Sequence, residues 1–288
     1  MRRALVAVVV FGAVLAVAEG VRAEERIRVR IETSGKVEDL RLEDYVAGVV
    51  GSEMPGSFPL EALKAQAVAA RSYALTRKID AQASGKPWDI GGGVLSQVYR
   101  GRESPASRAA VDATAGEVLV SGVEPVEAYF HAVCCGRTES GLSALGKDLP
   151  YLSPVDCGDC EGAPGARWRR TFTAAELGRA AGLGGPADAV RVSSRTGTGR
   201  AERIEVLRGE RVSGMAAADL RQRLGYARLP SLAFEVTKAG SGFAFEGTGQ
   251  GHGAGMCQWG AAVMARAGKT YREILAHYYP GTEIVKMY

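Results

Sequence analysis

A glutamate in front of a proline is the first residue whose type and setting could do chemistry. Glu53 is flanked by Val49, Val50 and Met54, and a turn at Pro55 follows it. Apolar neighbours remove water from a carboxyl group, and this raises its pKa toward the value that a general acid needs. An ordinary surface or helix-capping glutamate is the alternative, and the spacing alone does not decide between the two.

A second candidate site lies within and directly after a segment with glycine at every second position from 247 to 255. Glycine lets a backbone pack tightly or approach a ligand closely. His252, Gln258 and Trp259 carry the imidazole, amide and indole groups that a sugar-binding cleft uses for hydrogen bonding and stacking. A purely structural histidine is the alternative here.

Cysteines and one histidine form a third candidate site. His131, Cys134, Cys157 and Cys160 offer one nitrogen and three sulfurs, a tetrahedral set typical of a closed, structural zinc site. Two disulfides drawn from these three cysteines and Cys135 are the alternative. The chain has five cysteines, an odd number, so at least one is free, bound to a metal or paired outside the chain.

The N-terminus has the pattern of a secretory signal peptide over residues 1–23. A basic start at Arg2 and Arg3 precedes an apolar run from Ala4 to Ala18, and small residues continue to Ala23. The run is shorter than the roughly 20 residues that cross a bilayer. We therefore expect export to the periplasm or to the cell wall and extracellular space, where disulfides are permitted, with no stable membrane span after cleavage.

The rest of the chain, residues 24–288, is expected to be one catalytic unit with an inserted β-rich lobe. With 46% apolar residues it can bury a full core. The chain has 36 Lys and Arg against 32 Asp and Glu, and without the charges of the signal peptide the net charge is only +2. This charge is too small to predict nucleic-acid binding.

The elements that would position these sites are strands and helices in mixed order. Leu63, Ala67, Ala70 and Ala74 recur at helical spacing and predict a long helix from Pro59 to Ile79, with Arg71 among the charged residues of its solvent side. Strands are predicted at 26–32 and 231–245, hairpins at 117–132 and 189–207, and further helices at 173–181, 216–224, 256–267 and 271–278.

This order lacks regular β-α-β alternation, so the predicted fold class is α+β. We expect a mixed sheet core, a long helix after the loop that carries Glu53, and a β-rich subdomain.

Taken together, the chain resembles the SpoIID/LytB family, named for stage II sporulation protein D and for an amidase enhancer. The resemblance covers nearly all of the chain after the signal peptide. It rests on Leu42–Pro55, Leu60–Leu75, Ser96–Gly101, Tyr129–Glu139, Val212–Gly214 and Gly249–Ala261, in that order. Two residues depart from the family pattern: Cys135 stands where a glycine is common, and Cys257 stands where a serine is usual.

The resemblance implies a lytic transglycosylase that cleaves the bond between N-acetylmuramic acid and N-acetylglucosamine in peptidoglycan strands, with strands stripped of their stem peptides as the expected substrate. Glu53 would protonate the glycosidic oxygen and then, as carboxylate, take the proton of the muramyl C6 hydroxyl. The product would carry a 1,6-anhydro end. No second carboxylate is needed to activate water, unlike the pair used by most glycosidases.

The resemblance also implies ligands and partners. Five residues would hold the saccharide: Gln97, Tyr99, His252, Gln258 and Trp259. No cofactor is implied for catalysis, but zinc around the His131 and cysteine region is implied for some members. The alternative function is a non-catalytic wall-binding protein that stimulates a separate N-acetylmuramoyl-L-alanine amidase, which would then be its partner.

Overall fold

The computed structural model describes residues 24–93, 96–158 and 160–288. The predicted signal peptide, residues 1–23, lies outside the described residues. Within the described ranges, no helix combines the length and the apolar character that a membrane crossing requires.

The fold is α+β, as predicted. The helices are α1 (Leu42–Glu53), α2 (Leu60–Ala83), α3 (Pro105–Asp112), α4 (Gly141–Leu145), α5 (Ala174–Ala180), α6 (Ala217–Leu224), α7 (Gln258–Arg266) and α8 (Tyr271–Tyr278). A 3-10 turn covers Pro150–Leu152.

The strands of the described residues form several small sheets rather than one large one. Their sheet orders are β2-β1-β3, β10-β9-β8, β11-β12-β7, β13-β6 and β14-β4-β5. The strands are β1 (Arg26–Arg30), β2 (Val37–Arg41), β3 (Ile90–Gly91), β4 (Glu117–Ser121), β5 (Glu124–Pro125), β6 (Phe130–His131), β7 (Arg167–Thr173), β8 (Ala189–Arg195), β9 (Ala201–Arg208), β10 (Arg211–Ala216), β11 (Ala233–Ala239), β12 (Gly242–Thr248), β13 (Met256–Cys257) and β14 (Glu283–Lys286).

Helix α2 is the central element of the first hydrophobic core. Its middle, residues 65 to 75, is buried on every side, which is the pattern of a helix enclosed by other elements rather than lying on a surface. Helices α1, α3, α7 and α8 and strand β4 pack around it. Small alanine side chains at five of these eleven positions let the neighbouring helices approach closely.

Arg71 does not lie on the solvent side of α2, and this expectation was wrong. The residue is fully buried, and its guanidinium pairs with both carboxylate oxygens of Glu43, at 3.0 and 2.6 Å. Glu43 also accepts hydrogen bonds from the Gly116 N–H and the Tyr288 hydroxyl. A bidentate partner that is itself hydrogen-bonded is what allows a charged side chain to be buried.

A second hydrophobic core lies within residues 167–248, which we call the β-rich lobe. It is lined by aromatic and aliphatic side chains such as Trp168, Phe172 and Phe245. Two antiparallel three-stranded sheets, β10-β9-β8 and β11-β12-β7, enclose it together with α5 and α6.

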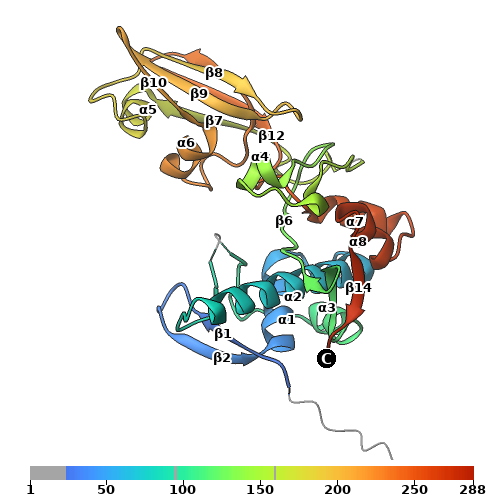
Figure 1. Cartoon of the computed structure of the whole chain (residues 1–288). Coiled ribbons are helices and arrows are strands. Elements are labelled where there is room, and N and C mark those ends of the chain that lie inside the picture. Colours follow the sequence, from blue (N-terminus) through green and yellow to red (C-terminus); the bar gives the residue numbers. More distant parts are fainter. Residues whose placement is uncertain (1–23, 94–95, 159) are drawn as a thin grey trace, which may run out of the picture.

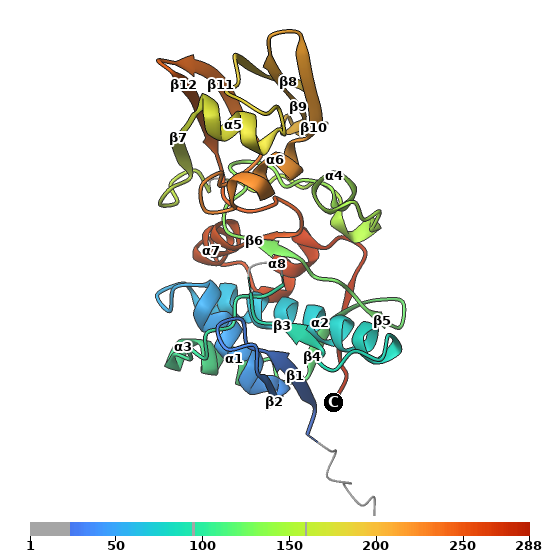
Figure 2. The same cartoon turned by 90° about the vertical axis from the view of Figure 1, so that its left-hand side faces the viewer.

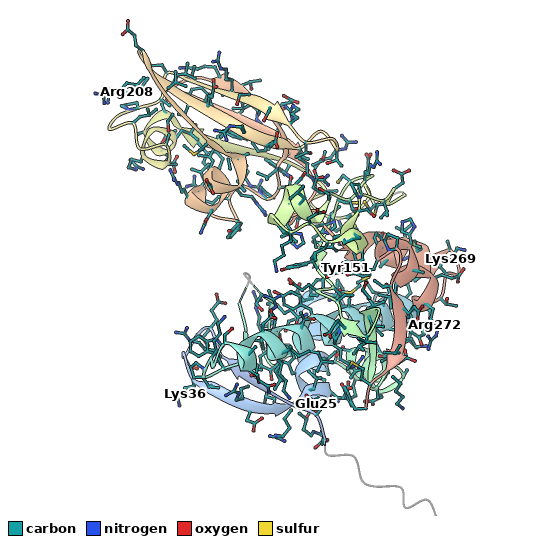
Figure 3. All side chains as sticks on the ribbon, in the orientation of Figure 1. Glu25, Lys36, Tyr151, Arg208, Lys269 and Arg272 are labelled. Atoms are coloured by element: carbon teal, nitrogen blue, oxygen red, sulfur yellow. The ribbon has the colours of Figure 1, made fainter. Side chains whose placement is uncertain are left out.

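The two cores occupy opposite ends of the molecule. In Figure 1 the β-rich lobe is at the top and α1, α2 and α3 are at the bottom, with β6 and α7 between them. The view in Figure 2, turned by 90°, shows the same arrangement. Accordingly, Arg208 lies far from Glu25 and Lys36 in Figure 3. The segments that hold the second and third candidate sites therefore lie near the junction of the two ends.

Several predicted elements differ from those observed. In the predicted hairpin at 117–132, only β4 and β5 pair with each other, around Gly122. Strand β6, from the same segment, pairs in parallel with β13 instead. The strand at 231–245 is two strands, β11 and β12, paired around Gly240. The helix at 256–267 begins at Gln258, because Met256–Cys257 is strand β13.

Candidate active site

The Glu53 carboxyl lies where three segments of the chain meet. Glu53 is the last residue of α1. Its Oε1 accepts a hydrogen bond of 2.8 Å from the Val98 N–H, and its Oε2 accepts a long one of 3.5 Å from Gln258 Nε2 at the start of α7. These donors fix the orientation of the carboxyl group without filling all of its acceptor positions.

Burial raises the pKa of Glu53 above its usual value. The hydrogen bonds from Val98 and Gln258 and the positive charge of Arg100 oppose this rise, but desolvation is the largest effect. No other carboxylate acts on Glu53 among the charges of the described residues. Glu53 thus has the electrostatic setting of a solitary general acid.

Gln258 links Glu53 to a second glutamine that no sequence motif marks. Gln66, in the fully buried part of α2, accepts a hydrogen bond of 3.4 Å from Gln258 Nε2. Gln66 Nε2 is buried and has no hydrogen-bond partner within the described residues. A free buried donor beside Gln258 and Glu53 is suited to a ligand oxygen or a water molecule.

Replacing Gln258 with leucine is expected to shift the pH profile of any activity that depends on Glu53. The Gln258 hydrogen bond favours the ionised carboxylate, so its loss raises the pKa of Glu53 further. An activity that needs protonated Glu53 falls as the pH rises through this pKa, so its alkaline limb should move to higher pH. Rates measured from pH 4 to 9 check this, and lower rates with an unmoved alkaline limb would contradict it.

Gln97 and Tyr99 support the loop that carries Val98. Gln97 is buried, donates from Nε2 to the Ala70 carbonyl at 3.1 Å and accepts at Oε1 from the Tyr45 hydroxyl at 3.0 Å. Tyr99 stacks on Tyr45 with ring centroids 5.2 Å apart. The amide of Gln97 is thus engaged at both ends, which suits it to positioning the loop, while its predicted contact with saccharide stays a prediction.

The glycine-rich segment brings His252 against the first core. Nε2 of His252 donates to the Phe130 carbonyl at 2.9 Å, and Nδ1 accepts from the Ala254 N–H at 3.1 Å. Burial lowers the pKa of His252 to about 3, and neighbouring His131 adds to the effect. The imidazole is therefore neutral at physiological pH, with both nitrogens engaged.

Gly255 shows why this segment needs glycine. Its φ is +68°, and a Cβ at this position would lie 2.0 Å from the Tyr129 carbonyl oxygen. We expect Gly255→Ala to destabilise the protein by about 2–4 kcal/mol, combining backbone strain with the clash. Gly281 has a similar φ of +77° but open space around it, so Gly281→Ala should cost only about 1 kcal/mol. Urea unfolding measures both, and equal losses would contradict this account.

A cleft with a volume of about 390 Å³ opens between the β-rich lobe and the first core. One side is formed by Tyr73, Ser96, Tyr129 and His252, and the other includes Asp219 and Gln222 of α6. Other lining residues are Ala144, Leu145, Ala218, Arg221, Tyr226, Leu232 and Gly251. Such a mixture of aromatic, amide and hydroxyl groups suits a polar ligand with apolar faces, such as a sugar.

One residue of the cleft wall is close in sequence to a residue that binds Glu53. Ser96, at its wall, is two residues from Val98, the donor to Glu53. Trp259 follows Gln258 and packs edge-on against Phe58, with ring centroids 4.8 Å apart. The structure therefore brings Gln258 directly to Glu53 and places His252 in the cleft wall. Trp259 instead packs against Phe58, two residues before the start of α2.

Four cysteine sulfurs form a separate buried cluster. The Sγ atoms of Cys134, Cys157, Cys160 and Cys257 all lie within 4.8 Å of one another, and this group could hold a metal ion. Four sulfurs at about 2.3 Å from a tetrahedral ion would be about 3.8 Å apart. The sulfur–sulfur distances would have to shorten by no more than about 1 Å to form such a shell, so the donor set fits zinc.

The fourth member of this cluster is Cys257 and not His131, the residue predicted from the sequence pattern. Strands β6 and β13 set His131 directly opposite Cys257. His131 Nδ1 makes a 3.0 Å hydrogen bond with the Ala254 carbonyl oxygen, while its buried Nε2 has no hydrogen-bond partner among the described residues. Cys135 lies outside the four-sulfur group, and all five cysteines are free thiols. Cys257 also caps α7, where its sulfur accepts from the Gly260 N–H.

Comparison with known proteins shows what this chain is similar to. Residues 31–120 match the family model described as stage II sporulation protein. Stage II sporulation protein D of Bacillus subtilis is 34% identical over 265 residues, covering 86% of this chain and 75% of that protein. An uncharacterized protein of Brachyspira hyodysenteriae is 38% identical, with coverage of 86% and 68%. The amidase enhancer of Bacillus subtilis is 27% identical, with coverage of 82% and 40%.

Proposed function

The chain belongs to the stage II sporulation protein D family, and on this premise we propose that it acts on peptidoglycan as an exported lytic transglycosylase. The bond cleaved is that between N-acetylmuramic acid and N-acetylglucosamine. The observation that carries the proposal is the Glu53 carboxyl, which is desolvated, oriented by two donors and free of any second carboxylate among the charges that act on it.

Glu53 performs both proton transfers in this proposal. Its raised pKa keeps a protonated fraction available to protonate the glycosidic oxygen as the bond to the muramyl C1 breaks. The resulting carboxylate takes the proton from the muramyl C6 hydroxyl, whose oxygen then bonds to C1. The proton is returned to Glu53, no water is consumed, and no second carboxylate is required.

The cleft lined by Ser96 and His252 is the proposed path of the glycan strand toward Glu53. Its volume of about 390 Å³ falls in the range of small-ligand sites. His252 presents a neutral imidazole at its wall, and Gln258 and Gln66 offer amide groups next to Glu53. Gln97, Tyr99 and Trp259 are proposed to complete the saccharide site, by holding the loop and the helix that form it.

We further propose that Cys134, Cys157, Cys160 and Cys257 hold a structural zinc ion, with His131 adjacent to this set. A closed four-thiolate shell has no open position for substrate, so the ion would supply folding energy rather than catalysis. Because Cys257 directly precedes Gln258, a fixed cluster would hold the start of α7 against Glu53.

A non-catalytic role is the second candidate. The similarity to the amidase enhancer of Bacillus subtilis favours it. In that case the chain would bind the wall and stimulate an N-acetylmuramoyl-L-alanine amidase, and Glu53 would contribute nothing to the stimulation.

Release of soluble glycan from amidase-treated and untreated peptidoglycan separates these candidates. The transglycosylase proposal predicts release by the purified protein alone, with faster release from the treated, peptide-free strands. The enhancer role predicts no release by the protein alone, but faster peptide release when an amidase is added, and the same stimulation by Glu53→Gln.

A further inference from the structure

The charges of the chain are divided unevenly between its two ends. The β-rich lobe, residues 167–248, contains 14 Lys and Arg against 8 Asp and Glu, a net charge of +6. Residues 24–166 and 249–288 contain 19 Lys and Arg against 23 Asp and Glu, a net charge of −4. The lobe that does not carry Glu53 is therefore the cationic one, although the chain as a whole is close to neutral. Such a field attracts polyanions.

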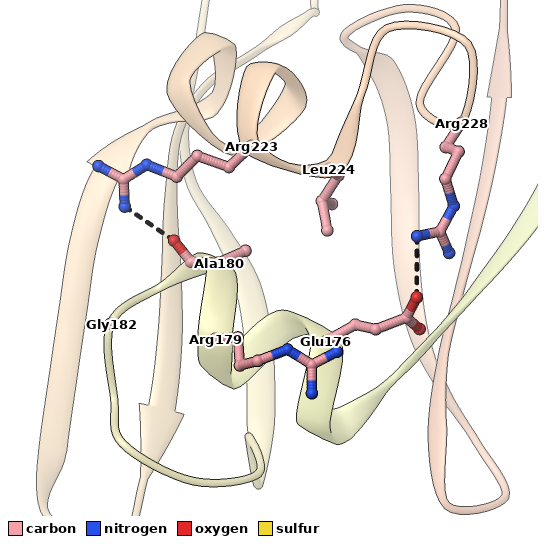
Figure 4. A pocket seen from close by; sticks show the side chains of 7 residues that line it. All are labelled: Glu176, Arg179, Ala180, Gly182, Arg223, Leu224 and Arg228. Carbon is pink, nitrogen blue, oxygen red and sulfur yellow. Dashed lines mark hydrogen bonds and ion pairs between the residues drawn. The ribbon is translucent and has the colours of Figure 1, made fainter.

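An open pocket of about 550 Å³ concentrates positive charge on this lobe. It lies between α5 and α6, as Figure 4 shows. The lining residues are Glu176, Arg179, Ala180, Gly182, Arg223, Leu224 and Arg228. Three guanidinium groups thus share the pocket with a single carboxylate.

That carboxylate is already satisfied within the protein. Glu176 forms an ion pair of 2.8 Å with Arg228. It also accepts hydrogen bonds from the N–H and the hydroxyl of Thr173, the residue that caps α5. The pKa of Glu176 is lowered to about 2 by hydrogen bonds from the Thr173 N–H, from Arg228 and from the Thr173 hydroxyl. The remaining net charge of the pocket, +2, belongs to Arg179 and Arg223.

These two arginines have donors to spare. Arg223 Nη1 donates to the Ala180 carbonyl at 2.7 Å, which anchors the side chain across the pocket and leaves its other N–H groups available. The exposed Arg179 side chain has no hydrogen-bond or ion-pair partner within the described part of the chain. A guanidinium group has five N–H donors in a planar fork that matches the oxygens of a phosphate group.

We propose that this pocket binds phosphate groups of an anionic cell-wall polymer with repeating phosphodiesters, and that the β-rich lobe thereby holds the protein on the wall. Leu224 and Ala180 give the pocket an apolar wall for the carbon atoms between phosphates. The net charge of +6 on the lobe exceeds the +2 of the pocket. The rest of the lobe surface therefore attracts further phosphates of the same polymer. This inference rests on the proposed export to the wall and not on the chemistry of Glu53.

Binding of poly(glycerol phosphate) to the full mature chain tests the proposal. The double variant Arg179→Glu with Arg223→Glu removes the two guanidinium groups of the pocket that have no carboxylate partner within the described residues. The control, Arg203→Glu with Arg211→Glu, makes the same change in net charge at exposed positions of β9 and β10 that do not line the pocket. We expect the pocket variant to bind at least about tenfold more weakly than the parent, and the control less than about threefold.

Three results would overturn the proposal: no binding by the parent chain, an equal loss in the pocket variant and the control, or equally tight, pocket-dependent binding of single-stranded DNA with the same number of phosphates. All three chains should have the same melting temperature and should release the same products from short peptide-free glycans. The products released from short glycans report on the transglycosylase proposal alone, so a failure of the anchoring proposal can be told apart from a failure of that one.

Discussion

Replacing Glu53 with glutamine is expected to lower the rate of glycan release by a factor on the order of 10³. A glutamine has nearly the same size as glutamate and can still accept the Val98 hydrogen bond, but it has no proton to give to a leaving oxygen. Loss of a general acid typically costs about 10²–10⁴ in rate. The measurement is the initial rate of soluble glycan release from amidase-treated peptidoglycan.

Two controls make this result specific to Glu53 chemistry. The variant should bind insoluble peptidoglycan as tightly as the parent does, since glutamine preserves the shape of the site. Exposed Glu283, on strand β14, has no part in the cleft, and Glu283→Gln should keep full activity. Equal rates in Glu53→Gln and the parent would remove Glu53 from the mechanism.

Replacing Cys157 with serine is expected to cost more than about 3 kcal/mol of unfolding free energy and to lower the melting temperature by about 10 °C. In the proposed site this cysteine supplies one of four thiolates, and a metal bound only by the folded chain adds its binding energy to folding. Cys157 also contacts the Tyr278 hydroxyl at 2.9 Å and lies against Gly260, so the change reaches α7 and α8.

Cys135→Ser is the matched control for this prediction. Cys135 lies outside the cluster and directs its thiol to the Ala166 carbonyl, so serine should preserve most of the stability. The purified parent should contain one zinc per chain, and a chelator should lower its melting temperature toward that of Cys157→Ser. A metal-free parent that melts at the same temperature with and without chelator would contradict the structural zinc ion.

Local sequence patterns predicted the positions of helices and strands better than they predicted which distant residues contact one another. The spacing of Leu63, Ala67 and Ala70 predicted helix α2, and Thr173 caps α5 where the predicted helix begins. Arg71 was misplaced because its partner, Glu43, is 28 residues away. A helical period alone cannot distinguish a charged residue in water from one buried against a distant carboxylate.

The same limit applies to the candidate site. Apolar neighbours predicted a desolvated Glu53, and its pKa is raised by burial as expected, whereas its catalytic role stays a prediction. Gln66 escaped notice because nothing within α2 marks it, and only contact with Gln258, 192 residues later, brings it to the site. Cys257 joins the other sulfurs through the parallel pairing of β6 and β13, a long-range register that cysteine spacing does not encode.

The most direct test of the central claim is the mass of the products released from amidase-treated peptidoglycan by the mature chain, with Glu53→Gln as control. A lytic transglycosylase gives 1,6-anhydro-muramyl ends, which are lighter than hydrolytic ends by one water molecule, about 18 mass units. We predict anhydro products with the parent and none with Glu53→Gln. Reducing-end products would show a hydrolase instead, and an absence of products despite retained wall binding would support the amidase-enhancer role.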